Sequence, residues 1–235
     1  MKQSRLIKLL FILTGVLVAS LLAVQACMVI IIHSVSANPC GLNKSIMVEN
    51  TSHAERLISQ GMFDKPCGGI YPIHAASQKA NQQILKLLLN KGEDPNRLDD
   101  AVFMSPIMWL VTGTGLTNET SIECFELLAE NGANINLKSP DTGLSPLHLA
   151  VDSRDFKTTK VLIERGAEID AQDKQGKTPL HYAVEYKNEM LVELLLDSGA
   201  NSSLVDNNNE TPLDIAKRMN FPDIQKRLTE QSKTE

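Results

Sequence analysis

Hydrophobic residues recur at helical spacing in short segments, which polar and glycine-containing stretches separate. In "TPLHYAV", which begins at Thr178, Leu180 and Ala183 lie three residues apart and therefore on one helical face. A second kind of segment, "MLVELLLDS", has an apolar side and stops at Gly199, where glycine can take the left-handed conformation that ends helices. This pattern predicts pairs of short antiparallel helices.

Both kinds of segment repeat along the chain at a nearly constant period. The segments "YPIHAAS", "SPIMWLV", "SPLHLAV", "TPLHYAV" and "TPLDIAK" place prolines at positions 72, 106, 146, 179 and 212, which are 34, 40, 33 and 33 residues apart. The first four are followed by "LLLNKGEDPN", "LLAENGANIN", "LIERGAEIDA" and "LLLDSGANSS". A period of this size is typical of a stacked array of repeats that share one continuous core.

These motifs resemble the ankyrin repeat family, whose signature is TPLHxA followed by a glycine–alanine turn, over about residues 50–232. The resemblance implies an all-α solenoid of helix–turn–helix units, with hairpin fingers such as "DAQDKQGK" between them. The residues agree with this fold. Ser145 and Thr178 supply N-cap hydroxyl groups, and the proline that follows each one takes the first helical position, where its missing N–H costs nothing.

The period divides the chain into an N-terminal segment, a cap and five repeats. In the cap, "HAERLISQG" predicts a single helix that ends near Gly61, and a short polar helix starting near Pro222 closes the other end. We expect a hydrophobic export or anchor helix within 1–37, an N-terminal capping region at 38–70, and repeats at 71–104, 105–144, 145–177, 178–210 and 211–235, the last including the C-terminal cap.

Repeat two departs most from the family pattern. Met108 replaces the signature histidine, Trp109 follows it at a slot where the family usually places a core leucine, and six extra residues in "TGTGLTNET" predict a loop at 113–118. This loop is either a surface insertion or a partner contact. In repeat one, Tyr71 replaces the capping Ser or Thr and predicts a weaker cap.

The histidine of the signature raises the question of catalysis. His74, His148 and His181 all occupy the signature position, where the resemblance implies a hydrogen-bonding role that stiffens the turn. The sequence contains no GxSxG, phosphate loop or HExxH motif, and nothing in it gathers a nucleophile, a base and an orienting acid. We therefore expect a protein that is not an enzyme and that uses no cofactor.

The N-terminal segment predicts export. Lys2, Arg5 and Lys8 precede 24 uncharged residues, Leu9–Ile32, which are enough to cross a bilayer as a helix. A signal peptide cleaved before Asn38, an uncleaved membrane anchor and a lipoprotein modified at Cys27 all remain open. Each of them places the rest of the chain outside the cytoplasm, and we expect the bacterial periplasm, with membrane contact if the segment is retained.

The net charge bears on the class of partner, and the cysteines bear on disulfide formation. Residues 38–235 carry 20 bases and 28 acids, a net charge of −8 that repels phosphate backbones, so nucleic acid is not an expected partner. Cys40 and Cys67 flank the start of the globular region and are expected to form a disulfide outside the cytoplasm, or else are two unrelated small residues. Cys124 occupies an apolar helical position, and no Cys/His cluster has zinc spacing.

The resemblance implies a scaffold that binds proteins through finger tips and the exposed ends of first helices. Tyr186 and Leu144 are the best anchors at the corresponding positions by residue type and expected exposure. The expected partner-binding residues are Met104, Asp141, Leu144, Asp152, Lys174, Gln175, Lys177, Glu185, Tyr186, Asn207, Asn208, Lys217 and Arg218.

The expected function is stoichiometric capture of a partner protein outside the cytoplasm. By its architecture the chain looks like bacterial immunity proteins that neutralise a secreted toxin or effector, such as a phospholipase. An envelope stress or assembly adaptor is the alternative, and an enzyme accessory protein is a weaker one. Asn50, Asn118, Asn201 and Asn209 match glycan acceptor motifs and leave a secreted eukaryotic origin open.

Overall fold

The computed structural model describes residues 41–61 and 66–231 of the 235-residue chain. The predicted export or anchor segment, Cys27 and Cys40 lie outside the described residues. No helix within the described ranges is long and apolar enough to span a membrane.

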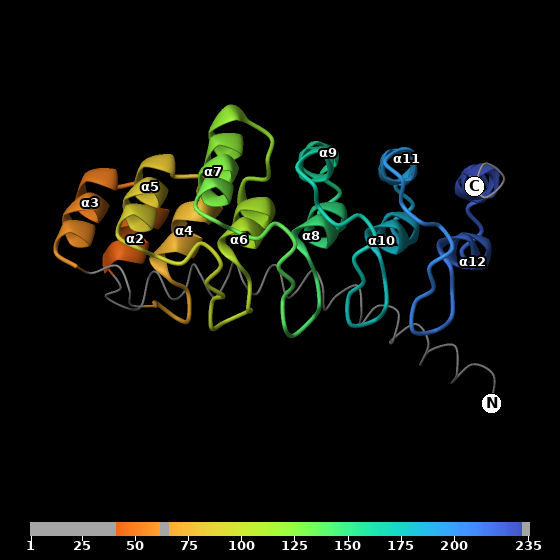
Figure 1. Ribbon diagram of the computed structural model, residues 1–235, viewed down its shortest axis with the longest axis horizontal. Coiled ribbons are helices and arrows are strands. Elements are labelled where there is room, and N and C mark those ends of the chain that lie inside the picture. The colour runs from red at the N-terminus through yellow and green to blue at the C-terminus, as the bar shows by residue number, and fades with distance from the viewer. Residues whose placement is uncertain (1–40, 62–65, 232–235) are drawn as a thin grey trace.

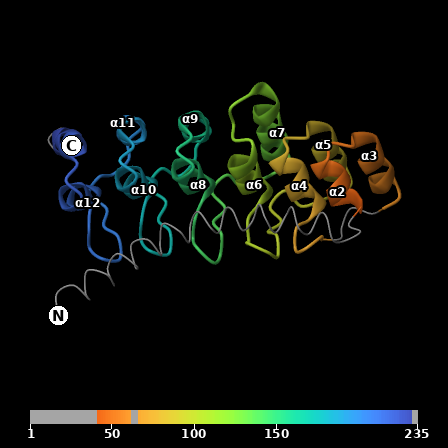
Figure 2. The ribbon, with the colours of Figure 1, turned by 180° about the vertical axis from the view of Figure 1, so that it is seen from behind.

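The described residues form two parallel rows of helices, with the finger loops projecting from one side (Figure 1; Figure 2 shows the back). No strand occurs in these ranges, only an isolated bridge between Cys67 and Ile70. The all-α repeat solenoid that the sequence predicts is therefore confirmed. The first row contains α2 (Gly41–Met47), α4 (Pro72–Gln78), α6 (Pro106–Gly113), α8 (Pro146–Asp152), α10 (Pro179–Glu185) and α12 (Pro212–Arg218). The second row contains α3 (Thr51–Ser59), α5 (Gln82–Asn90), α7 (Glu119–Glu130), α9 (Phe156–Glu164), α11 (Glu189–Asp197) and α13 (Pro222–Gln231).

Apolar faces of both rows meet in the interior. One cluster of buried residues runs from α2 to Leu162 in α9, and a second runs from Val151 in α8 to α13. Leu180, Leu191 and Leu195 are completely buried in the second cluster, and burying a leucine side chain contributes roughly 1.5–3 kcal/mol. Cys124 is a free thiol in the first cluster, and burial raises its pKa to about 12.

The N-terminal cap differs from the single helix that the sequence predicts. It is a helix pair, α2 and α3, and α2 packs against α4 as the first helix of a repeat would. The residues of α2, "GLNKSIM", bury Leu42 and Ile46 although they contain little periodic apolar signal. Cys67, at the end of this region, is disulfide-bonded. Its pairing with Cys40 stays a prediction.

The six extra residues of repeat two are also distributed differently from the prediction. The linker between α6 and α7 spans 114–118 and is two residues longer than its counterparts, while α6 has 8 residues against 7 and α7 has 12 against 9. In Figure 1, α7 rises above its neighbours. Leu116 in the linker is 1% exposed, and its N–H donates to Oγ1 of Thr158 at 2.7 Å. The middle of the insertion is therefore packed into the core and bonded to repeat three, whereas residues 117–120 are exposed.

Candidate interaction surface

The turns that start the first helices fix the fingers to the helix rows. Nδ1 of His148 accepts the backbone N–H of Ser145 at 3.2 Å and lies 2.8 Å from its hydroxyl oxygen. The other ring nitrogen, Nε2, donates to the carbonyl oxygen of Lys177 in the next finger at 3.1 Å. His181 makes the same contacts with Thr178 and Glu210.

Burial sets the charge state of these histidines. It lowers the pKa of His74, His148 and His181, because a charged imidazolium loses its hydration inside the protein. An Nδ1 that accepts and an Nε2 that donates describe a neutral ring. The structure thus places all three in the structural role that the sequence predicts.

Repeats one and two deviate at this turn. Nε2 of His74 bonds to the carbonyl oxygen of Arg97 at 2.8 Å, but Tyr71 provides no side-chain cap for α4, as predicted. In repeat two, Sδ of Met108 lies 3.5 Å from the backbone nitrogen of Ser105. A thioether has no N–H to donate, so the bond from the signature histidine to the next finger has no equivalent there.

Four fingers project below the first row, at 99–104, 139–144, 173–177 and 206–210. Each is closed by a backbone bond from its first residue to its last, such as Asp173 N–H to Lys177 O at 3.0 Å. Neighbouring fingers are also joined. Lys174 N–H donates to Thr142 O at 3.0 Å and Asn207 N–H donates to Gln175 O at 2.9 Å.

In three of these fingers a buried carboxylate, that of Asp99, Asp173 or Asp206, accepts backbone N–H groups of its own finger. Asp99, which is completely buried, accepts three backbone N–H groups of its own finger and Nε1–H of Trp109 at 2.9 Å. Asp173 accepts two backbone N–H groups and the hydroxyl of Tyr182 at 2.7 Å. Trp109 and Tyr182 occupy the same position of their repeats, and each satisfies the carboxylate at the base of the finger before it.

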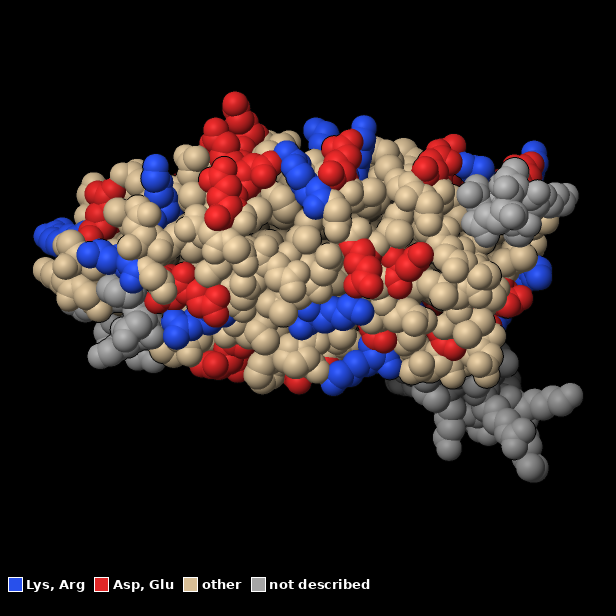
Figure 3. Space-filling view, in the orientation of Figure 1, with Lys and Arg blue, Asp and Glu red and all other residues tan. Residues whose placement is uncertain are grey.

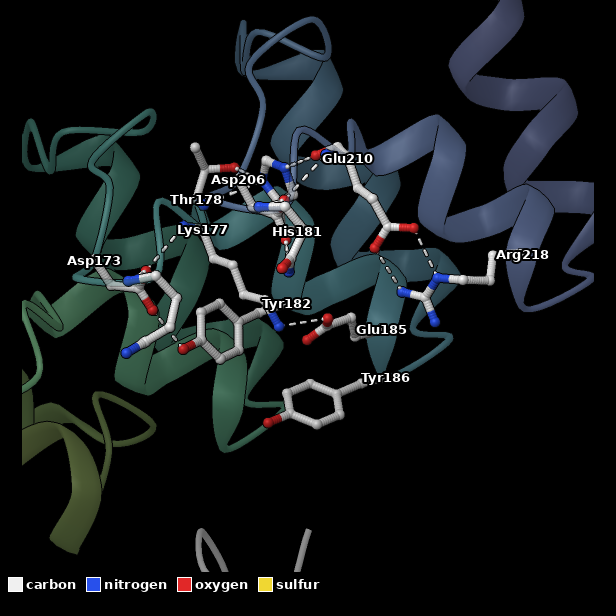
Figure 4. A network of polar contacts seen from close by, with 12 residues as sticks. Asp173, Lys177, Thr178, His181, Tyr182, Glu185, Tyr186, Asp206, Glu210 and Arg218 are labelled. Carbon is white, nitrogen blue, oxygen red and sulfur yellow. Dashed lines mark hydrogen bonds and ion pairs between the residues drawn. The ribbon is translucent and has the colours of Figure 1, made fainter. Parts of the chain in front are cut away.

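A network of polar and aromatic side chains lies along α10, α12 and the fingers before them (Figure 4). Lys177 and Glu185 form an ion pair at 2.5 Å, and the hydroxyl of Tyr186 donates to Asp152. The rings of Tyr182 and Tyr186 have centroids 6.2 Å apart. Burial, followed by the hydrogen bond to a carboxylate, raises the pKa of both tyrosines, so they remain neutral donors.

The network continues at both ends. The guanidinium carbon of Arg154 lies 5.0 Å above the ring of Tyr186, a cation–π geometry. On α12, Arg218 holds Glu210 through two hydrogen bonds of 2.8 and 3.0 Å, so the side chain after the fourth finger is also fixed.

The structure brings together most of the expected partner-binding residues of repeats three to five, but not Met104. That side chain packs beside Ile70 and Trp109 under the 99–104 finger. Among the expected residues, Asp141, Lys174, Gln175, Asn207, Asn208, Lys217 and Arg218 are exposed, whereas Met104, Leu144, Asp152, Lys177, Glu185 and Tyr186 are partly buried. The two expected anchors, Tyr186 and Leu144, are therefore less exposed than their residue types suggested.

Three residues of this surface, Tyr182, Arg154 and Phe103, were not predicted from the sequence. Tyr182 and Arg154 belong to the network, and the signal for Tyr182 was its equivalence to Trp109 with an aspartate in the preceding finger. Phe103 is 37% exposed at the 99–104 finger with φ of 54°, at a position that other fingers fill with glycine or asparagine. That substitution was visible in the sequence.

Comparison with known proteins agrees with this architecture. A family model for three copies of the ankyrin repeat matches residues 104–173 and 166–235, and a single-repeat model matches residues 68–100. The chain is also similar to the transient receptor potential channel pyrexia of Drosophila melanogaster, at 32% identity over 100 residues, which are 43% of this chain. That match spans 10% of the channel's length. The family models cover well over half of the chain, which belongs to the ankyrin repeat family and is a protein–protein interaction module.

Proposed function

We propose that the chain captures a partner protein in a one-to-one complex, on the surface that its fingers and first helices form. The main support for this proposal is that side chains on that surface are already held in place in the free protein. Lys177, Glu185, Tyr186 and Arg218 are each held by a specific partner side chain before any ligand binds.

Such order favours binding because free side chains lose rotamer entropy when a partner fixes them, at about 0.5–1.5 kcal/mol each. In this network folding has already fixed them. The surface also combines a pair of neighbouring tyrosine rings, tilted by 42° to one another, with a rim of exposed polar groups such as Lys174 and Asn207. Aromatic centres with polar rims are the usual arrangement of protein interfaces.

The compartment and the partner are the second part of the proposal. The uncharged segment Leu9–Ile32 after three basic residues supports export to the bacterial periplasm, as a soluble or membrane-anchored protein. There we propose a role in immunity, in which the chain neutralises a secreted effector such as a phospholipase by occupying its surface. An envelope stress or assembly adaptor would use the same surface and is the alternative.

Capture can be tested with variants that separate the ring of Tyr186 from its hydroxyl. The full chain is cross-linked in its native host, the partner is identified, and the purified pair is measured by calorimetry. Tyr186→Ala is expected to weaken binding about 30-fold, near 2 kcal/mol, whereas Tyr186→Phe keeps the ring and retains most of the affinity.

Two outcomes would contradict the proposal. One is a stoichiometry other than one to one, and the other is turnover of a substrate by the purified chain. The immunity role has a separate test, because co-expression with an effector encoded beside the gene should restore growth. Failure of that rescue with capture intact would favour the adaptor.

A further inference from the structure

One position of the fingers always has a left-handed backbone. It is the residue just before the last one of each finger, and it is Gly143 and Gly176 in two of them, with φ of 77° and 73°. Gly69 has the same place in the 67–70 turn, with φ of 83°. Asn209 fills it in the 206–210 finger, with φ of 59°. Phe103 fills it in the 99–104 finger. A bulky aromatic residue in this region is strained, and such strain persists only where the surroundings impose it.

The surroundings of Phe103 do impose it. The carboxylate of Asp99 accepts the N–H groups of Ala101 and Val102 through one oxygen and that of Met104 through the other, at 2.7–2.8 Å. These bonds bracket Phe103 on both sides. The finger therefore holds an aromatic side chain, 37% exposed, in a conformation that glycine would adopt without strain.

Glycine at this position normally lets the next finger approach. A Cβ at Gly143 would stand 2.7 Å from the backbone nitrogen of Lys174, and one at Gly176 would stand 3.0 Å from that of Asn207. These two fingers are joined to their successors by backbone bonds. Between the 99–104 and 139–144 fingers no backbone hydrogen bond forms in the described structure, and Pro140 stands where Lys174 and Asn207 provide their N–H.

Two departures from the pattern, Phe103 and Pro140, thus fall on one junction, which we call the 103/140 seam. Its surface is apolar. Phe103 and Pro140 are exposed, and Val102, Met104 and Leu144 are partly exposed beside them. The corresponding residues of the other fingers are polar, as in "KQGK" at 174–177 and "NNNE" at 207–210.

The charges around the seam define what fits it. Asp100 and Asp141 are exposed on the two fingers. Asp100 accepts the hydroxyl of Tyr71 at 3.1 Å, and neither carboxylate forms an ion pair with any described residue. In Figure 3, both acidic and basic side chains stand along the lower edge, where the fingers lie, with uncharged surface between them. A second copy of this acidic chain or an anionic lipid surface would be repelled there, while a cationic segment would be attracted.

We propose that the 103/140 seam is a docking site for a partner segment that carries a large apolar side chain flanked by lysine or arginine. This inference rests on the proposed capture of a protein and adds a site outside the tyrosine network, with a stated partner chemistry. Phe103 provides the apolar contact, and Asp100 and Asp141 provide the charge that selects basic flanks.

The test uses the full chain and three labelled peptides measured by fluorescence anisotropy. One has a central Leu-Trp pair with two lysines on each side, the second has glutamates in place of the lysines, and the third has serines in place of Leu-Trp. We expect the first to bind at least tenfold more tightly than the other two. Phe103→Gly should lose about tenfold of that affinity, and Asp141→Asn should lose less and reduce the salt dependence.

Stability measurements and a matched control exclude a purely structural role. Phe103→Gly relieves the left-handed strain, so its melting temperature should stay equal or rise. Phe156→Ala, which truncates an aromatic residue of similar exposure on α9, should leave peptide affinity unchanged. Equal binding of all three peptides, or a Phe103→Gly variant that melts lower with unchanged affinity, would overturn the inference.

Binding of a second copy of the chain, or of a membrane, to the seam would give different results. Concentration-dependent dimers that Phe103→Gly abolishes would assign the seam to a second copy, and Phe103-dependent binding to anionic vesicles would assign it to a membrane. Either result overturns the inference. A partner that binds through Tyr186 but ignores Phe103→Gly would also overturn it, while leaving the proposed capture function in place.

Discussion

Repeats two and four show how one framework can be stabilised in two different ways. In repeat four, His181 bonds to the finger that follows it, and Tyr182 bonds to Asp173 in the finger that precedes it. Repeat two has the equivalent bond from Trp109 to Asp99, but Met108 replaces the histidine and the insertion buries Leu116.

The 139–144 finger, where repeat two meets repeat three, also lacks hydrogen bonds that other repeats have. The base of its finger is Ser139, whose buried hydroxyl oxygen has no hydrogen-bond partner in the described structure, and Leu149 follows where Trp109 and Tyr182 stand elsewhere. In repeat two, buried side chains therefore take the place of the histidine bond to the next finger and of a bond to the residue at the base of its own finger. Ser139, which lacks this bond, is next to Pro140 of the 103/140 seam.

Acid should weaken the histidine-containing repeats most. The folded-state pKa of His74, His148 and His181 lies below the unfolded value of about 6.5, so the unfolded chain binds more protons in that window. Stability is full above about pH 6.5 and falls as the pH drops towards the folded pKa values. The maximum slope is about 1.4 kcal/mol per pH unit for each histidine, or about 4 for three.

Urea unfolding between pH 7.5 and 5 measures this slope. Repeat two has no signature histidine that contributes to this slope, because Met108 does not titrate. A His181→Gln variant should lose about a third of the slope. Stability that does not change between pH 7 and 5 would contradict the neutral, buried state of the three rings.

Gly113 tests the packing of the insertion. A Cβ there would collide with the backbone carbonyl oxygen of Gln78 and lie 3.0 Å from its Cα, so Gly113→Ala forces α4 and α6 apart. We expect a loss of about 3 kcal/mol in the free energy of unfolding. Gly166→Ala is the control. It meets nothing within 4 Å but has φ of 84°, and it should cost only about 1 kcal/mol. Equal losses by chemical denaturation would mean that the close approach of Gln78 is unimportant.

Trp109 and Tyr182 offer the finest comparison. Trp109→Phe removes the indole N–H from the fully buried Asp99 and should cost about 2 kcal/mol, within the range for an unsatisfied buried group. Tyr182→Phe removes the hydroxyl from Asp173 at a partly exposed site and should cost about 1 kcal/mol. The reverse order of losses would show that the two carboxylates are not equivalent in the way their positions suggest.

The repeat signals predicted the fold because they are local. Proline after a capping residue, the signature histidine and the glycine after the second helix each act within one turn, and each stands where the period placed it. The helix pair of the cap was missed because "GLNKSIM" owes its helix to packing on α4 rather than to its own pattern. The distribution of the insertion was missed because it depends on the contact of Leu116 with Thr158, 42 residues away.

The sequence predicted which residues lie on the candidate surface, but not which side chains they contact. Residues at finger tips and helix ends were identified from the period, but their partners were not. Tyr186 was expected to be a free anchor, yet it bonds to Asp152, which lies 34 residues earlier, and Arg154 stacks on it. Contacts between repeats of this kind follow from the stacking of the array, which a single repeat does not encode.

The central claim is that fingers and first helices form the surface that captures a protein. Amide hydrogen exchange of the full chain, with and without its cross-linked and purified partner, tests this most directly. We expect slower exchange in the fingers 99–104, 139–144 and 173–177 and at the C-terminal ends of α8 and α10, with the second row of helices unchanged. Protection confined to α5, α7, α9 and α11 would contradict it.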